Sequence, residues 1–148
     1  MGEKEKIGII FCKRYSQCGG GKCLRAMRNR EGAFSIYQNQ KIELVSNTTF
    51  YGDLCENKES LPIKMAKNKI QVIHLATGVV VDYPYFPKIK SFRSCIEQQF
   101  GVEVVIGTHP ITQKIYLTHK KLNTWNSPDW QEVIQPILAT KETRLAYS

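Results

Sequence analysis

Three of the five cysteines lie in one short, glycine-rich and basic segment, Cys12-Lys-Arg-Tyr-Ser-Gln-Cys18-Gly-Gly-Gly-Lys-Cys23. Thiolates bind metals and attack electrophiles, and nearby cations favour the thiolate over the thiol. Three thiolates can hold an iron–sulfur cluster, and four thiolates, or three with an imidazole, form a tetrahedral zinc site. We therefore expect a metal site, zinc or iron–sulfur, with Cys12, Cys18 and Cys23 as ligands.

Two further residues are candidates to complete this site. Cys55 lies in the loop after the second predicted strand, and His109 follows the fourth predicted strand, before a proline. Ligands of open parallel sheets bind beyond the carboxyl ends of the strands, and both residues are predicted at that edge. Thr77 and Thr108, at the ends of the third and fourth predicted strands, are expected at the same edge. The chain has no Cys-x-x-Cys pair, so spacing alone does not indicate zinc. The run of three glycines allows a sharp turn that could bring the cysteines together.

A thiol-redox or sulfur-handling enzyme is the competing hypothesis. Cys23 is predicted near the N-terminus of a helix, beside Lys22 and Arg25, where the helix dipole and the cations favour an anion. Cys18 could resolve a reacted Cys23 as a disulfide. The residues leave open whether the protein is an enzyme, and Cys23 and Cys18 are the catalytic candidates.

The same turn could instead bind an anion. Backbone amides at a helix start, here from Gly19, Gly20 and Gly21, form a site for negative groups, and Lys22 and Arg25 add charge. Residues 1–30 carry eight Lys or Arg and two Glu, a net +6 out of +8 for the chain. The expected partner is then an anionic small molecule or a nucleic acid.

Composition restricts the remaining possibilities. A chain of 148 residues with 42% hydrophobic residues is long enough for one domain with its own core. It has no apolar run of the ~18 residues that a membrane span needs, and its first residues are charged. We therefore expect a cytoplasmic protein with no membrane partner. In the reducing cytoplasm, clustered cysteines more often serve metal or redox chemistry than disulfides. The oligomeric state is not predicted.

The elements that position these residues alternate along the chain. Hydrophobic patterns predict strands at 6–11, 42–45, 70–76 and 102–106, and helices at 22–30, 60–66 and 88–100. This order predicts an α/β fold: a single-domain, open, mostly parallel sheet of about four strands flanked by helices. The tail, 111–148, is predicted as a helical extension packed on the domain of residues 1–110. Its helices are expected at 113–122 and from Ser127, with a kink or end at Pro136.

Three side chains in these elements are predicted to be structural or solvated. His74 lies inside the third predicted strand and is expected to be a buried histidine with hydrogen-bond partners. Cys95 lies on the apolar face of its predicted helix and is expected in the core. His119 precedes Lys120 and Lys121 and is expected in solvent.

The chain resembles the CGGC-domain family. The resemblance is carried by 6–16 and 18–23, by Glu31-Gly-Ala-Phe34 and Val72-Ile-His-Leu75, and by Gly107-Thr-His-Pro110. It covers roughly residues 6–110 and implies a small α/β domain with recurrent cysteines that suggest metal binding, without a settled reaction. The namesake Cys-Gly-Gly-Cys motif is degenerate, because Phe50-Tyr-Gly-Asp53 occupies its place.

Overall fold

The computed structural model describes residues 5–12, 21–50, 70–77, 89–123 and 128–147. Their elements follow the order of the sequence pattern. The strands are β1 (Glu5–Cys12), β2 (Ile42–Phe50), β3 (Val72–Leu75) and β4 (Glu103–Ile106). The helices are α1 (Gly21–Asn29), the 3-10 helix η1 (Gly32–Tyr37), α4 (Ile89–Phe100), α5 (Gln113–Leu122), α6 (Pro128–Leu138) and α7 (Lys141–Ala146). The α/β prediction is confirmed. The helix predicted at 60–66 lies outside the described residues.

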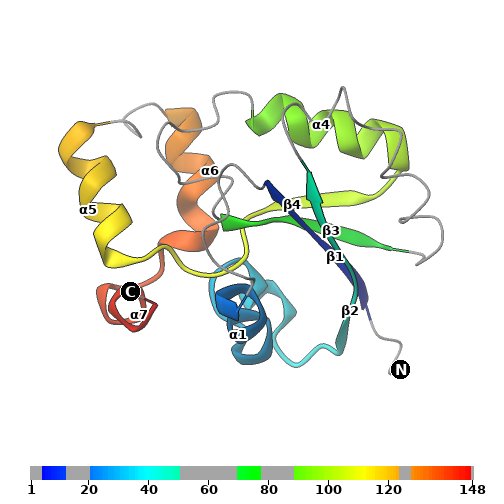
Figure 1. Ribbon diagram of the computed structural model, residues 1–148, viewed down its shortest axis with the longest axis horizontal. Coiled ribbons are helices and arrows are strands. Elements are labelled where there is room, and N and C mark those ends of the chain that lie inside the picture. The colour runs from blue at the N-terminus through cyan, green and yellow to red at the C-terminus, as the bar shows by residue number, and fades with distance from the viewer. Residues whose placement is uncertain (1–4, 13–20, 51–69, 78–88, 124–127, 148) are drawn as a thin grey trace.

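The four strands form one parallel sheet in the order β2-β1-β3-β4. Strand order reverses between β1 and β3, because β2 pairs with one edge of β1 and β3 with the other. Parallel strands with crossover helices on both faces are buried, which explains the continuous apolar run of β1. Figure 1 shows α1 on one side of the sheet and α4 on the other. The reversal creates the switch point at which open α/β sheets bind ligands.

The core lies on both faces of the sheet. Ile7, Ile9 and Ile73 are almost fully buried in the strands, and Phe34 from η1 is buried with them. The η1 helix contacts both α1 and α6, so it joins the first crossover to the C-terminal helices. None of the helices among the described residues has both the length and the apolar character to cross a membrane.

Glycine 32 brings η1 against the end of β4. Its φ is +61°, and a Cβ at this position would lie 2.5 Å from the Thr108 carbonyl oxygen. The next residue, Ala33, donates its N–H to the same oxygen at 2.9 Å. A residue with a side chain does not fit this contact without a shift of the backbone. This glycine therefore fixes the position of the Thr108 segment against η1.

The C-terminal helices lie beyond the carboxyl ends of β3 and β4 (Figure 1). Helix α5 covers the predicted range, 113–122. Pro136 lies inside α6, which continues for two residues and ends at Leu138. The short helices η1 and α7 have no counterpart among the predicted elements.

Candidate functional site

Cys23 is held at the carboxyl edge of the sheet. It is the third residue of α1, its side chain is 1% exposed, and it is not in a disulfide bond. Its Sγ lies 3.0 Å from Oγ1 of Thr108, a residue that follows β4. The start of a helix favours negative charge, whereas burial disfavours it. Cys23 is thus a buried thiol whose local partners suit either protonation state.

Two threonines at the ends of neighbouring strands form the base of this site. Thr77 follows β3 and Thr108 follows β4. The Thr77 N–H donates to Thr108 Oγ1 at 3.0 Å, and the Thr108 N–H donates to Thr77 Oγ1 at 2.9 Å. The Thr77 hydroxyl donates to the carbonyl of His109 at 2.6 Å. These reciprocal bonds satisfy polar groups that would otherwise be buried without partners.

The Thr108 hydroxyl proton has two acceptors within reach. Thr77 Oγ1 is 3.2 Å away and Cys23 Sγ is 3.0 Å away. When Cys23 is a thiol, its S–H donates to Thr108, whose hydroxyl then donates to Thr77. When Cys23 is a thiolate, the Thr108 hydroxyl rotates and donates to the sulfur. The site therefore accommodates loss of the thiol proton without leaving a buried polar atom unsatisfied.

His109 lies at the same edge and is held as a neutral imidazole. Its Nδ1–H donates to the carbonyl of Pro110 at 2.6 Å, so Nε2 carries the lone pair. Burial lowers the pKa of His109 to about 4; the bond to Pro110 opposes this, and the charge of Lys22 adds to it. A neutral imidazole with an acceptor Nε2 is the form that binds a metal.

Tyr147 covers this edge from the C-terminal segment. Its ring stacks on that of His109, with centroids 5.9 Å apart and planes 8° apart, and the Arg25 guanidinium lies 4.4 Å from the ring centroid. Its hydroxyl donates to Glu31 at 2.8 Å. Burial raises the pKa of Tyr147, and the Glu31 contacts and Cys23 add to the rise. Cys23 and His109 thus both lie near the same aromatic ring.

Arg25 is tied to that segment as well. Its Nη1 donates to the Ala146 carbonyl at 3.0 Å. Lys22 is half-buried and acts electrostatically on His109, while Gly21 begins α1 with nothing within 4 Å of the position its Cβ would occupy. These contacts show how the basic residues of the turn are arranged, and a role for them in anion binding remains a prediction.

His74 is a structural histidine, as its place in the strand predicted. Its Nδ1–H donates to the Gly107 carbonyl at 2.9 Å, and its Nε2 accepts from the Tyr37 hydroxyl at 2.8 Å. Phe34 stacks on its ring at 4.5 Å. Burial lowers the pKa of His74 to about 4, opposed by the Gly107 bond, and burial also raises the pKa of Tyr37. Both ring nitrogens are engaged, so His74 does not serve as a ligand.

The remaining predicted ligands are placed only in part. The backbone of Cys12 ends β1 and pairs with Phe50 of β2. Cys18, Gly19, Gly20 and Cys55 lie outside the described residues. Within the described part of the chain, no group of three or more Cys, His, Asp or Glu side chains is arranged to hold a metal ion. The convergence of Cys12, Cys18 and Cys23 therefore remains a prediction.

The predictions for Cys95 and His119 were wrong. Cys95 is half-buried and disulfide-bonded, so it is not a core thiol, although it lies on the predicted helix. His119 is 1% exposed. The flanking lysines suggested solvent, but residues on adjacent positions of a helix point in different directions, and His119 faces inward.

Sequence reasoning placed Thr77 and Thr108 at the strand ends but did not identify their mutual hydrogen bonds. Tyr147 was missed as part of the site. The signal for the threonines was their position two residues beyond paired strands. No local pattern links Tyr147 to His109, since the contact joins residues 38 positions apart.

Comparison with known proteins gives one match. The family model of the CGGC domain matches residues 6–109, which is most of the chain. Searches of curated proteins and of solved structures gave no match. The matched range includes β1 from its second residue, β2 to β4, Cys23 and the Thr77–Thr108 pair, and it ends at His109. The chain is therefore a member of the CGGC-domain family.

Proposed function

We propose that the protein binds a metal, as zinc or an iron–sulfur cluster, through thiolates of Cys12, Cys18 and Cys23 at the carboxyl edge of the sheet. The observation that carries the proposal is the position of the Cys23 sulfur, 3.0 Å from Oγ1 of Thr108, which follows β4 at the carboxyl edge of the sheet. Metal ligands of this kind need deprotonated sulfur and a donor that orients it, and the Thr108 hydroxyl is such a donor.

The strand register supports a role for Cys12. Ile10 pairs with Leu75, and Leu75 pairs with Ile106. Two residues beyond these positions are Cys12 at the end of β1, Thr77 after β3 and Thr108 after β4. Neighbouring strands lie about 4.8 Å apart, so we expect the end of β1 to lie close to the Thr77–Thr108 pair that holds Cys23.

His109 is our candidate for a fourth ligand, with Cys55 as the alternative. The bond from Nδ1 to Pro110 leaves Nε2 as the acceptor nitrogen, and the low pKa keeps the ring neutral at pH 7. When bound, the metal would supply Lewis-acid or electron-transfer chemistry. The protein would supply the thiolates, the hydroxyl that orients Cys23 and an aromatic cover from Tyr147.

The test is metal analysis of the full chain purified without oxygen and with reductant. The unsubstituted protein should carry stoichiometric zinc or iron, and C12S, C18S and C23S should each lose most of it. S94A is the matched control, because Ser94 is an exposed residue of α4, on the other side of the sheet from α1. Absence of metal in the unsubstituted protein, or full retention in C23S, would contradict the proposal.

A thiol-redox function is the second candidate, and one observation favours it. Cys23 lies in the first turn of α1 and has a hydroxyl donor within reach, two features that stabilise a thiolate. Residue-resolved alkylation of metal-free protein against pH tests this. Half-maximal alkylation of Cys23 well below the free-cysteine value of ~8.5 would support an activated thiol, and a value at or above it would contradict one.

A further inference from the structure

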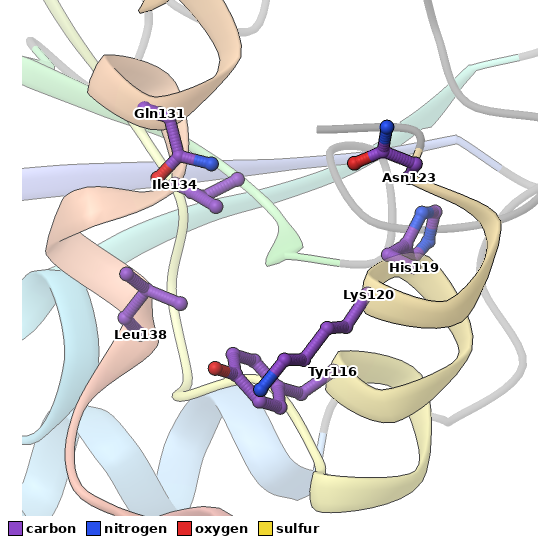
Figure 2. A pocket seen from close by; sticks show the side chains of 7 residues that line it. All are labelled: Tyr116, His119, Lys120, Asn123, Gln131, Ile134 and Leu138. Carbon is purple, nitrogen blue, oxygen red and sulfur yellow. The ribbon is translucent and has the colours of Figure 1, made fainter. Parts of the chain in front are cut away.

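A polar cavity lies between α5 and α6, in the part of the chain that follows the matched family range. Its volume is about 240 Å³. Figure 2 shows its side chains projecting from the two helices toward one gap. The lining residues are Tyr116, His119, Lys120 and Asn123 from α5 and its C-cap, and Gln131, Ile134 and Leu138 from α6.

The walls of this α5–α6 pocket combine hydrogen-bond donors with an apolar surface. Lys120 contributes an ammonium group, and Asn123 and Gln131 contribute side-chain amides. Ile134 and Leu138 form the apolar part on the α6 side (Figure 2). Small-molecule sites typically have this composition, in which a few polar groups orient a ligand against apolar walls.

Lys120 gives the lining of the pocket a positive charge. None of its seven described lining residues is acidic. The Arg144 guanidinium lies 4.0 Å from the centroid of the Tyr116 ring, and the Lys120 amine lies 5.9 Å from it. Arg144 donates to Gln113 Oε1 at 2.8 Å and to the Leu138 carbonyl at 3.2 Å. The Lys120 ammonium in the pocket lining therefore favours an anionic ligand.

The pocket walls are fixed by the fold. Asn123 has φ 58° and caps α5, and its N–H donates to the carbonyls of His119 and Lys120. The His119 side chain is 1% exposed, and Ile134 is 2% exposed. Arg144 links α7 to the start of α5 and to the end of α6. A preformed pocket loses less conformational entropy on binding than a mobile one.

We propose that the α5–α6 pocket binds a small organic carboxylate with a compact apolar group. Lys120 pairs with the carboxylate, and the Asn123 and Gln131 amides donate to its oxygens. Ile134 and Leu138 contact the apolar group. The volume limits the ligand to a molecule smaller than those of typical drug-sized sites, which occupy roughly 300–1,000 Å³. This inference does not depend on the metal site.

The probe is benzoate, and benzyl alcohol is its uncharged counterpart. Binding to the isotope-labelled full chain is followed by NMR through the side-chain amide signals of Asn123 and Gln131. Benzoate should shift both signals saturably, and benzyl alcohol should bind about tenfold more weakly, because it lacks the charge-assisted hydrogen bond.

K120M tests the assigned ion pair, and K121M is its matched control. Both lysines are exposed on α5, but Lys121 does not line the pocket. We expect K120M to weaken benzoate binding by about tenfold and K121M to leave it within about twofold of the unsubstituted protein. Unperturbed backbone signals elsewhere show that each variant is folded. Absence of saturable shifts, equal binding of the two probes, or equal effects of the two substitutions would overturn the proposal.

Discussion

The polar groups at the carboxyl edge of the sheet and those in the α5–α6 pocket are arranged in different ways. At the edge, Cys23, Thr77 and Thr108 are buried and bond to one another. In the pocket, Lys120, Asn123 and Gln131 are exposed and face an open cavity. Buried groups that hydrogen-bond one another fix the geometry of a reactive atom, whereas exposed donors that face a cavity can bind a ligand. The two regions should therefore respond differently to substitution.

The largest expected effect comes from the glycine that packs on the edge. G32A places a Cβ in a contact of 2.5 Å with the Thr108 carbonyl and imposes a positive φ on alanine. We expect the free energy of unfolding to fall by about 3 kcal/mol, from backbone strain and overpacking together. Urea denaturation measures this change.

G101A is the matched control for this substitution. Gly101 has φ +62°, but nothing lies within 4 Å of the position of its Cβ. Only the conformational cost applies there, about 1 kcal/mol. Equal losses in G32A and G101A would show that the contact with Thr108 contributes nothing, and a weakened benzoate interaction in folded G32A would show that the two regions are coupled.

Removal of the Thr108 hydroxyl should have the next largest effect. T108V keeps the shape of the side chain but takes away the acceptor of the Thr77 N–H and the partner of Cys23. The loss of stability should be about 2 kcal/mol, the cost of leaving a buried donor unsatisfied. T108S, which restores a hydroxyl, should recover most of the loss. Equal stability of T108V and the unsubstituted protein would contradict the network.

Acidification should lower the free energy of unfolding through the buried His74 of β3. The pKa of His74 is about 4 in the folded protein and 6.5 as its ordinary value, so the unfolded chain binds the proton first as pH falls. Stability from a neutral His74 is complete above pH 6.5 and is lost as pH falls toward 4. The slope from this residue is about 1.4 kcal/mol per pH unit within that window.

Unfolding curves at pH 7, 6 and 5 measure this slope, and H74Q should remove the contribution of His74. If the slope is the same in H74Q and in the unsubstituted protein, burial of a neutral His74 does not account for it.

The smallest effect is expected at the rim of the pocket. N123G removes an exposed amide at a position with φ 58°, where glycine is at least as suitable as asparagine. Stability should change by less than about 0.5 kcal/mol, since the cap depends on the backbone N–H. Benzoate binding should nevertheless weaken. A large stability loss in N123G would show that the pocket rim is a closed structural network like the edge.

The sequence predicted the fold well where one pattern covers a whole element. The apolar run of β1 and the helical spacing of α4 and α5 each gave the right element to within about two residues. Short elements were not predicted. Helix η1 depends on the approach of Gly32 to Thr108, and α7 depends on contacts of Arg144 and Tyr147 with distant residues. Such tertiary contacts leave no periodic signal in six residues.

The candidate site was predicted in part, for a related reason. The rule that strand ends share one edge correctly placed Thr77, Thr108 and His109 near Cys23's helix start. It could not show that a hydroxyl would face the Cys23 sulfur, because this depends on rotamers and on the relative position of α1 and β4. The prediction for His119 was wrong because the neighbouring lysines, Lys120 and Lys121, say nothing about the direction in which the His119 side chain leaves the helix.

Cobalt(II) titration of the reduced, oxygen-free protein tests the central claim most directly. Sulfur-to-cobalt charge-transfer absorption reports thiolate ligation, so it should be strong in the unsubstituted protein and in S94A, and clearly weaker in C23S. Equal absorption in C23S and the unsubstituted protein, or none in either, would contradict a metal centre built on the thiol beside Thr108.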